Sequence, residues 1–165
     1  MELKGSRVIA ADRQTVWAAL NDPDVLKACI PGCEELTGSA SEGFEAKVTQ
    51  KIGPVKAKFS GVVSLSDVVE AESYTISGEG KGGAAGFAKG GAKVALADVE
   101  GGTELTYDVD AKVGGKLAQL GSRLIDGFSK KMADQFFEKF QAVVEGTDDD
   151  GPGEEKKGWL SRLTG

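Results

Sequence analysis

The chain has 165 residues, of which 40% are hydrophobic and 28% are charged, a composition typical of one globular domain. Its net charge of −6 disfavours a nucleic-acid partner, because phosphate binding requires a basic face. No apolar run approaches the ~18 residues of a membrane span, and the N-terminal sequence lacks the features of a signal peptide, so we expect a cytoplasmic protein.

The N-terminal part predicts one strand followed by two short helices. Residues 3–10 have the pattern of a strand, and Asp12 is placed to cap a helix over residues 13–20. Asp22 is placed to cap a second helix, for which Pro23 suits the first position. The Pro-Gly pair that follows ends this helix and turns the chain. We therefore expect a small helical corner set into a sheet.

Two cysteines, Cys29 and Cys33, lie next to this turn. Their spacing is not C-x-x-C, no second pair matches it, and the chain contains no histidine. Small packing residues are therefore a better interpretation than a metal site or a redox pair. The lack of histidine also removes the commonest general base and the usual catalytic triads. We expect no catalytic residue and no metal site.

From residue 33 to residue 113 the hydrophobic period is two, which predicts a series of strands. Within 44–52 and 55–65, apolar side chains alternate with polar ones, and the pattern continues to residue 113. Turn signals such as the Gly pair at 101–102 separate these runs. The pattern is typical of an antiparallel meander of about six strands, with one dry face and one wet face.

The stretch GEGKGGAAGFAKGG, residues 78–91, contains a G-x-G-x-x-G pattern like that of dinucleotide-binding loops. A true fingerprint opens a helix whose N-terminus receives the pyrophosphate. Here more glycine and a strand-like run follow, so we interpret the stretch as a glycine-rich hairpin at the open end of the sheet. Phe87, with Lys81 and Lys89 beside it, makes this hairpin a candidate gate or a contact with lipid or enzyme.

From residue 116 to residue 144 the period becomes helical, with apolar residues at three- and four-residue steps. One helix of this length would span roughly 43 Å. Gly121 and Gly127 lie inside it, each at a cost of about 1 kcal/mol relative to alanine. The predicted fold is α+β of the helix-grip type: a curved antiparallel sheet of about seven strands around a long C-terminal helix, with two short helices after the first strand.

The inward face of the predicted sheet contains many small side chains. Its larger apolar residues are interrupted by Ala46, Ala57, Gly61, Ala92 and Ala111. The sheet and helix then enclose more space than these side chains fill, and an unfilled interior is costly. We therefore predict an elongated apolar cavity for a lipophilic molecule. Its candidate lining residues are Phe59, Phe87, Tyr107, Leu117, Leu120, Gly121, Leu124 and Phe128. The alternative is that these residues form a filled core.

The C-terminal part divides into a linker and a tail. Residues 1–145 form the predicted domain, residues 146–155 an acidic Gly/Pro-rich linker, and residues 156–165 a short basic tail. The tail combines Trp and Leu on one side of a short helix with basic residues on the other, which suits a membrane interface. The candidate membrane-binding residues are Lys156, Lys157, Trp159, Leu160, Arg162 and Leu163. A peptide that docks a partner protein and a frayed chain end are the alternatives.

Three stretches resemble one known family: VWAALNDPDVLKACIPGCEEL (16–36), KIGPVKAKFSGVVSL (51–65) and VGGKLAQLGSRLI (113–125). The chain resembles the family of the carbon monoxide dehydrogenase G subunit, part of the START-like (SRPBCC) helix-grip superfamily of lipophilic-ligand binders. The resemblance implies an accessory protein encoded alongside the molybdenum-containing carbon monoxide dehydrogenase and related hydroxylases and linked to their membrane attachment. Members commonly end in a membrane-seeking tail, whereas this chain has no full hydrophobic span there.

The resemblance implies a non-catalytic protein that recruits the carbon monoxide dehydrogenase complex to the membrane. Because electrons from carbon monoxide must reach a quinone in the lipid, we expect the cavity to hold a quinone, menaquinone or ubiquinone, and we expect no covalent cofactor. The expected location is cytoplasmic and peripheral, on the inner face of the cell membrane. The alternatives are an assembly chaperone of the dehydrogenase and a small cyclase-type enzyme that uses the helix-grip cavity.

Overall fold

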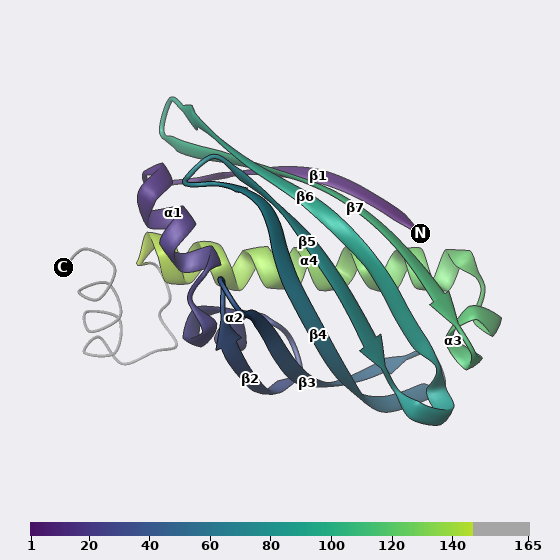
Figure 1. Ribbon diagram of the computed structural model, residues 1–165. Helices are drawn as coiled ribbons and strands as arrows, with labels where there is room; N and C mark the ends of the chain where they lie inside the picture. Colours follow the sequence, from purple (N-terminus) through teal and green to yellow (C-terminus); the bar gives the residue numbers. More distant parts are fainter. Residues whose placement is uncertain (147–165) are drawn as a thin grey trace.

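The computed structural model describes residues 1–146, which form a seven-stranded antiparallel sheet curved around a long helix (Figure 1). The elements are β1 (Glu2–Ile9), α1 (Arg13–Leu20), α2 (Pro23–Cys29), β2 (Cys33–Ser39), β3 (Gly43–Ile52), β4 (Val55–Val69), β5 (Ser73–Lys81), β6 (Phe87–Val99), β7 (Gly102–Gly114), α3 (Lys116–Gln119) and α4 (Ser122–Glu145). The strand order is β1-β7-β6-β5-β4-β3-β2. The predicted helix-grip fold is confirmed.

The strands follow the two-residue period of the sequence. In β4, residues from Val55 to Leu65 alternate between half-buried and exposed positions, because successive side chains point to opposite faces of a sheet. The half-buried face is concave and α4 runs across it (Figure 1). Small residues of neighbouring strands are adjacent on this face, since Ala46 of β3 is paired with Gly61 of β4.

Local side-chain caps begin both short helices where the sequence predicts them. The Asp12 carboxylate accepts a hydrogen bond from the Thr15 backbone N–H (2.8 Å), and the Asp22 carboxylate accepts one from the Asp24 N–H (2.9 Å). The bonds at Thr15 lower the pKa of the Asp12 carboxyl, because they favour its charged form. Pro23 occupies the first turn of α2, where a backbone N–H would have no hydrogen-bond partner within the helix.

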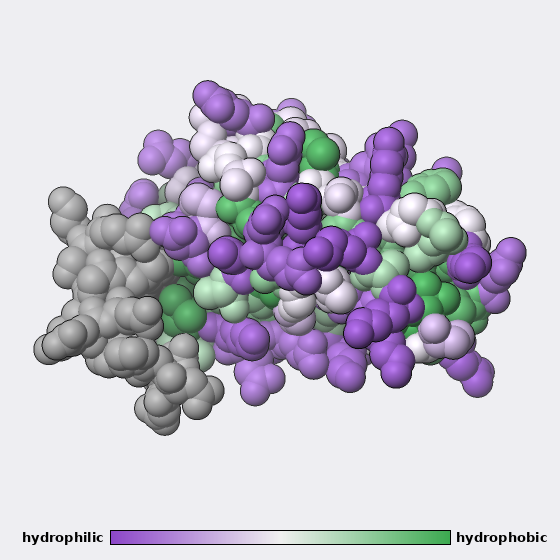
Figure 2. All heavy atoms as spheres, turned by 90° about the horizontal axis from the view of Figure 1, so that it is seen from below, coloured by the Kyte–Doolittle hydropathy of each residue, from purple (hydrophilic) through white to green (hydrophobic). Residues whose placement is uncertain are grey.

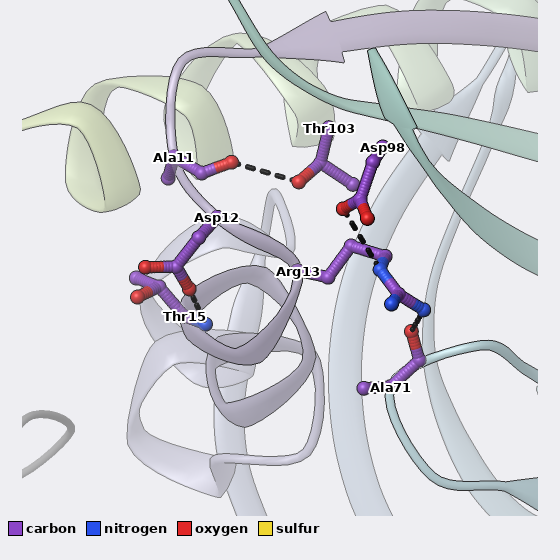
Figure 3. Close-up of polar contacts among 7 residues, drawn as sticks. All are labelled: Ala11, Asp12, Arg13, Thr15, Ala71, Asp98 and Thr103. Atoms are coloured by element: carbon purple, nitrogen blue, oxygen red, sulfur yellow. Dashed lines mark hydrogen bonds and ion pairs between the residues drawn. The ribbon is translucent and has the colours of Figure 1, made fainter.

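Polar contacts hold α1 against the end of the sheet (Figure 3). The Arg13 guanidinium donates to Asp98 near the end of β6 (2.8 Å) and to the backbone oxygen of Ala71 in the β4–β5 connection (3.1 Å), so it bridges these two segments. The fully buried Thr103 hydroxyl donates to the Ala11 oxygen (2.7 Å). These bonds fix the helical corner, which closes one end of the curved sheet.

Two hydrophobic clusters occupy opposite ends of the space between α4 and the sheet. The larger one joins α1, α2 and the second half of α4 to the strands and includes Ile9, Val16, Leu105 and the fully buried Phe140. The smaller one consists of Ile52, Leu117 and Ile125, with Met1, Val55, Phe59, Val113, Leu120 and Phe128 packed against it. Each end of the fold is therefore packed separately.

The prediction of one continuous helix over residues 116–144 is wrong at Gly121. Leu120 ends α3, and Gly121, with a φ of +91°, precedes α4. This left-handed backbone is disfavoured for residues with a Cβ, so the glycine permits the chain to turn between α3 and α4. Gly127 lies within α4, and a Cβ built there would contact nothing within 4 Å.

The glycine-rich stretch is a hairpin, as predicted, and most of its glycines lie within β5 and β6. The connection is a three-residue 3-10 turn over Gly83–Ala85 followed by β6, with no helix that could receive a phosphate. Gly86 has a φ of +112°, and a Cβ there would lie 2.0 Å from the Gly114 oxygen. Only glycine allows the hairpin to pass this close to the end of β7.

The predicted membrane-binding residues Lys156, Lys157, Trp159, Leu160, Arg162 and Leu163 lie outside the described residues, as does the linker apart from Gly146. Gly146 caps the end of α4 with a left-handed conformation, φ +71°. Among residues 1–146, no helix is both long enough and apolar enough to cross a membrane.

Candidate ligand-binding cavity

A cavity of about 420 Å³ lies between α4 and the concave face of the sheet. Every strand contributes to its wall, together with α1, α2 and the middle of α4. The lining residues are Leu3, Leu20, Leu26, Ile30, Leu36, Phe44, Ala46, Val48, Gly61, Val63, Leu65, Tyr74, Ile76, Ala92, Val94, Leu105, Tyr107, Val109, Ala133, Phe136 and Phe137.

Small residues on facing elements leave this space open. Ala46, Gly61 and Ala92 come from three strands, and Ala133 faces them from α4. A Cβ built on Gly61 would meet no atom nearer than 3.8 Å, so the site has room for a side chain that the sequence does not provide. The cavity is therefore a consequence of residue size at particular positions.

The cavity wall is chemically uniform. The polar side-chain groups that the described residues contribute to it are the hydroxyls of Tyr74 and Tyr107. Tyr74 is 5% exposed, and this burial raises the pKa of its phenol well above the ordinary value, because the charged form loses its hydration. Neither hydroxyl makes a hydrogen bond within the described residues 1–146. The described part of the wall thus provides two hydroxyl groups and no carboxylate, ammonium or guanidinium group.

Aromatic rings form the side of the cavity next to β1. The Tyr107 ring stacks on Phe137 with centroids 5.0 Å apart, and the Arg7 guanidinium lies 5.5 Å from the Phe137 centroid. Arg7 also donates a hydrogen bond to the Asp134 carboxylate at 2.6 Å. Lys130 and, to a smaller extent, Arg7 lower the pKa of the Asp134 carboxyl. A Cβ on Gly5 would lie 2.4 Å from the Tyr107 hydroxyl oxygen. Glycine in β1 therefore makes room for the tyrosine ring.

The described residues around the cavity include no cluster of titratable side chains. Among residues 1–146, no carboxylate or amine lines the cavity, and no group of three or more Cys, Asp or Glu side chains is placed to hold a metal ion. Cys29 is buried in the larger cluster and Cys33 is half-buried at the start of β2. Cys29 thus has the packing role that the sequence indicates, whereas the Cys33 thiol lies outside both clusters and donates to the Glu35 oxygen at 3.4 Å.

The structure places one of the eight predicted lining residues, Tyr107, in the cavity wall. Phe59, Leu117, Leu120 and Phe128 belong to or pack on the smaller cluster at the end of the sheet. Leu124 is 39% exposed, and Phe87 is 43% exposed on the outer face, over Gly114. The remaining predicted residue, Gly121, precedes α4. Their assignment to the lining is corrected, because α3 and the first turns of α4 cover the end of the sheet rather than its middle.

The α4 residues of the wall are Ala133, Phe136 and Phe137. They lie farther along the helix than the lining residues predicted from the sequence. Leu26 and Ile30 of the α2 region were also not predicted. Some of the small residues on the strands did indicate the position of the cavity. Ala46, Gly61 and Ala92 line the cavity, whereas Ala57 and Ala111 do not.

Comparisons with known proteins agree with this architecture. A family model of the carbon monoxide dehydrogenase G subunit (CoxG) matches residues 5–145. The crystal structure of a conserved protein from Geobacillus kaustophilus is 30% identical, with a TM-score of 0.82 over 89% of this chain and 97% of that chain. A Rhizobium leguminosarum protein, 17% identical, has a TM-score of 0.67 over 88% of this chain and 94% of its own. A Thermus thermophilus protein, 13% identical, has a TM-score of 0.65 over 90% of this chain and 100% of its own.

The last two likenesses concern the fold alone, and no curated protein matches the sequence. The family model, in contrast, covers nearly the whole described domain. It includes the three stretches that carry the resemblance, 16–36, 51–65 and 113–125. The chain therefore belongs to the family of the carbon monoxide dehydrogenase G subunit, CoxG.

Proposed function

We propose that the protein is a non-catalytic accessory protein of a carbon monoxide dehydrogenase or related hydroxylase that binds a lipophilic ligand and recruits the enzyme to the membrane. Membership of the CoxG family supports the accessory role. The apolar cavity of about 420 Å³ is the observation that carries the ligand-binding part. Its size falls within the roughly 300–1,000 Å³ of small-molecule sites.

The energetics of the cavity favour an occupant. Unfilled apolar space is costly, at about 24 cal/mol per Å³ where it is fully enclosed, because the wall atoms lose their packing partners. Water would find only the Tyr74 and Tyr107 hydroxyls as side-chain partners in the wall, whereas a buried water usually makes about three hydrogen bonds. An apolar ligand therefore fills the space better than solvent.

A quinone, menaquinone or ubiquinone, matches both the apolar wall and its two hydroxyls. The ring and tail of a quinone are apolar, and its carbonyl oxygens accept hydrogen bonds. The Tyr74 phenol stays protonated because its pKa is raised by burial, so it remains a donor. Carbon monoxide oxidation releases electrons that must enter the membrane quinone pool, and a carrier between enzyme and lipid would provide this path.

Deletion of the gene in its host separates this proposal from the assembly-chaperone alternative. We expect the deletion strain to contain dehydrogenase that is active with an artificial electron acceptor but no longer supports respiration on carbon monoxide. Inactive dehydrogenase in the deletion strain would contradict the proposal and indicate a maturation factor. Complementation with the wild-type gene is the control for effects on neighbouring genes.

The basic tail is the proposed membrane anchor. Burial of Trp159, Leu160 and Leu163 would contribute about 5 kcal/mol before the cost of ordering the segment, and anionic lipid adds roughly 1 kcal/mol per nearby cation. We expect weak, reversible binding to vesicles. A full-length chain with Trp159→Ser and Leu160→Ser should sediment less with vesicles than the wild type, and equal sedimentation would contradict the role of the tail.

A further inference from the structure

Positive charge is concentrated at one end of the sheet, on an acidic protein. The β3–β4 turn, the β5–β6 hairpin and the β7–α3–α4 connection meet there, at the right-hand end of Figure 1. We call this end the tip and define it as segments 49–60, 78–91 and 110–131. The tip contains ten Lys or Arg residues and three Asp or Glu, whereas the whole chain has 20 and 26. The charge of the tip is thus opposite to that of the molecule.

Most of the tip cations form no ion pair within residues 1–146. All ten are exposed, and three of them, Lys58, Lys81 and Lys130, form ion pairs. The other seven make no ion pair with any residue of the described part of the chain: Lys51, Lys56, Lys89, Lys112, Lys116, Arg123 and Lys131. An excess of cations of this kind attracts an anionic surface.

Exposed apolar side chains lie among these cations. Phe87 is 43% exposed and Leu124 is 39% exposed, and Phe87 is paired directly across the hairpin with Lys81. A shallow groove beside Leu124 is lined by apolar residues that include Leu120 and Phe128 and by the cations Lys51, Arg123 and Lys131. Figure 2 shows apolar side chains gathered at this end of the molecule with hydrophilic ones around them.

The chemistry of the tip favours a lipid surface over a protein partner. Nine of its ten cations are Lys and one is Arg, whereas protein interfaces are enriched in Arg and depleted of Lys. Lysines that surround exposed Phe and Leu are typical of segments that bind at the membrane interface. We propose that the tip is a docking surface for membranes that contain anionic phospholipid. This inference rests on the membrane recruitment proposed above and assigns part of it to the folded domain.

Vesicle co-sedimentation of the full-length chain tests the tip. We expect binding to phosphatidylcholine vesicles with about 30% phosphatidylglycerol, weak binding to pure phosphatidylcholine, and loss of binding as salt rises from about 0.1 M to 1 M. The triple variant Lys56→Gln/Lys89→Gln/Lys112→Gln should lower the partition coefficient roughly 100-fold, at about fivefold per lysine. These lysines form no ion pair in residues 1–146, so the variant should fold normally.

A matched variant changes the same net charge elsewhere. Lys27, Lys93 and Lys139 are exposed, lie outside the tip and form no ion pair within the described residues. Their replacement with Gln should change vesicle binding by no more than about twofold, because they lie on α2, the middle of β6 and the second half of α4 rather than on the tip. Equal losses in the tip and matched variants would overturn the proposal.

The tail variant and the tip variant together separate the tip from the tail and from the enzyme. The Trp159→Ser/Leu160→Ser chain should keep tip-dependent binding to anionic vesicles. If only this tail variant loses binding, recruitment by the tail stands and the tip proposal is wrong. If the tip variant binds vesicles normally but no longer captures the purified dehydrogenase, the tip is an enzyme-docking surface, which also contradicts the proposal.

Discussion

The hydroxyl group of Tyr74 is the most unusual polar atom of the cavity wall. It lies on a buried residue, in an apolar environment, without a hydrogen-bond partner in the described residues 1–146. A buried polar group without a partner costs about 1–3 kcal/mol, and such groups in native proteins usually have a reason. A ligand carbonyl that accepts from this hydroxyl would provide one.

Alkaline unfolding of Tyr74→Phe tests the burial of this phenol. Because the pKa of Tyr74 is raised above 10.0 in the folded state, its contribution to stability is intact below about pH 10 and is lost as pH rises above it. The unfolding free energy of the wild type should therefore fall relative to Tyr74→Phe by about 1.4 kcal/mol per pH unit above pH 10. Urea unfolding of both proteins measures this, and a pH-independent difference would contradict the burial of the phenol.

At the scale of elements, the sequence predicts best what local chemistry decides. The caps Asp12 and Asp22 accept hydrogen bonds from backbone N–H groups two or three residues away, so their roles can be predicted from the local sequence. The break at Gly121 is not, because the apolar period of Leu117, Leu120 and Leu124 continues through it. Only the packing of α3 over the end of the sheet requires the chain to turn there.

The close approach of the β5–β6 hairpin to the end of β7 should depend on glycine at position 86. A methyl group at Gly86 would meet the Gly114 oxygen at 2.0 Å in a left-handed conformation, so Gly86→Ala should cost about 3 kcal/mol or more. Gly80 in the same hairpin is the control, because a Cβ there contacts nothing within 4 Å. Gly80→Ala should change the unfolding free energy by less than about 1 kcal/mol. Similar urea midpoints for the two variants would contradict this close approach.

At the scale of the whole molecule, the fold class was predictable and the position of the cavity was not. Alternation in the strands and a long amphipathic helix determine the helix-grip architecture. The lining depends on which turn of α4 faces the middle of the sheet, and this follows from the break at Gly121 rather than from periodicity. The basic tip was likewise not predictable from the sequence, because its three segments become neighbours only when the antiparallel strands pair.

A cavity-filling substitution should separate ligand binding from stability. Ala46 lines the cavity beside Gly61, so Ala46→Phe should place its ring in the open space and stabilise the ligand-free protein by about 0.5–2 kcal/mol. The same change should exclude the ligand. Ala97→Phe is the matched control, because Ala97 is exposed in β6. A loss of stability in Ala46→Phe alone would indicate that the cavity is already filled by protein atoms.

The most direct test of ligand binding is native mass spectrometry of the full-length chain purified without detergent from its own host. We predict the mass of the chain plus one lipophilic molecule, which organic extraction identifies as a quinone. The Ala97→Phe control should retain this added mass and Ala46→Phe should lose it. A bare chain mass for the wild type, or the same added mass on Ala46→Phe, would contradict the account.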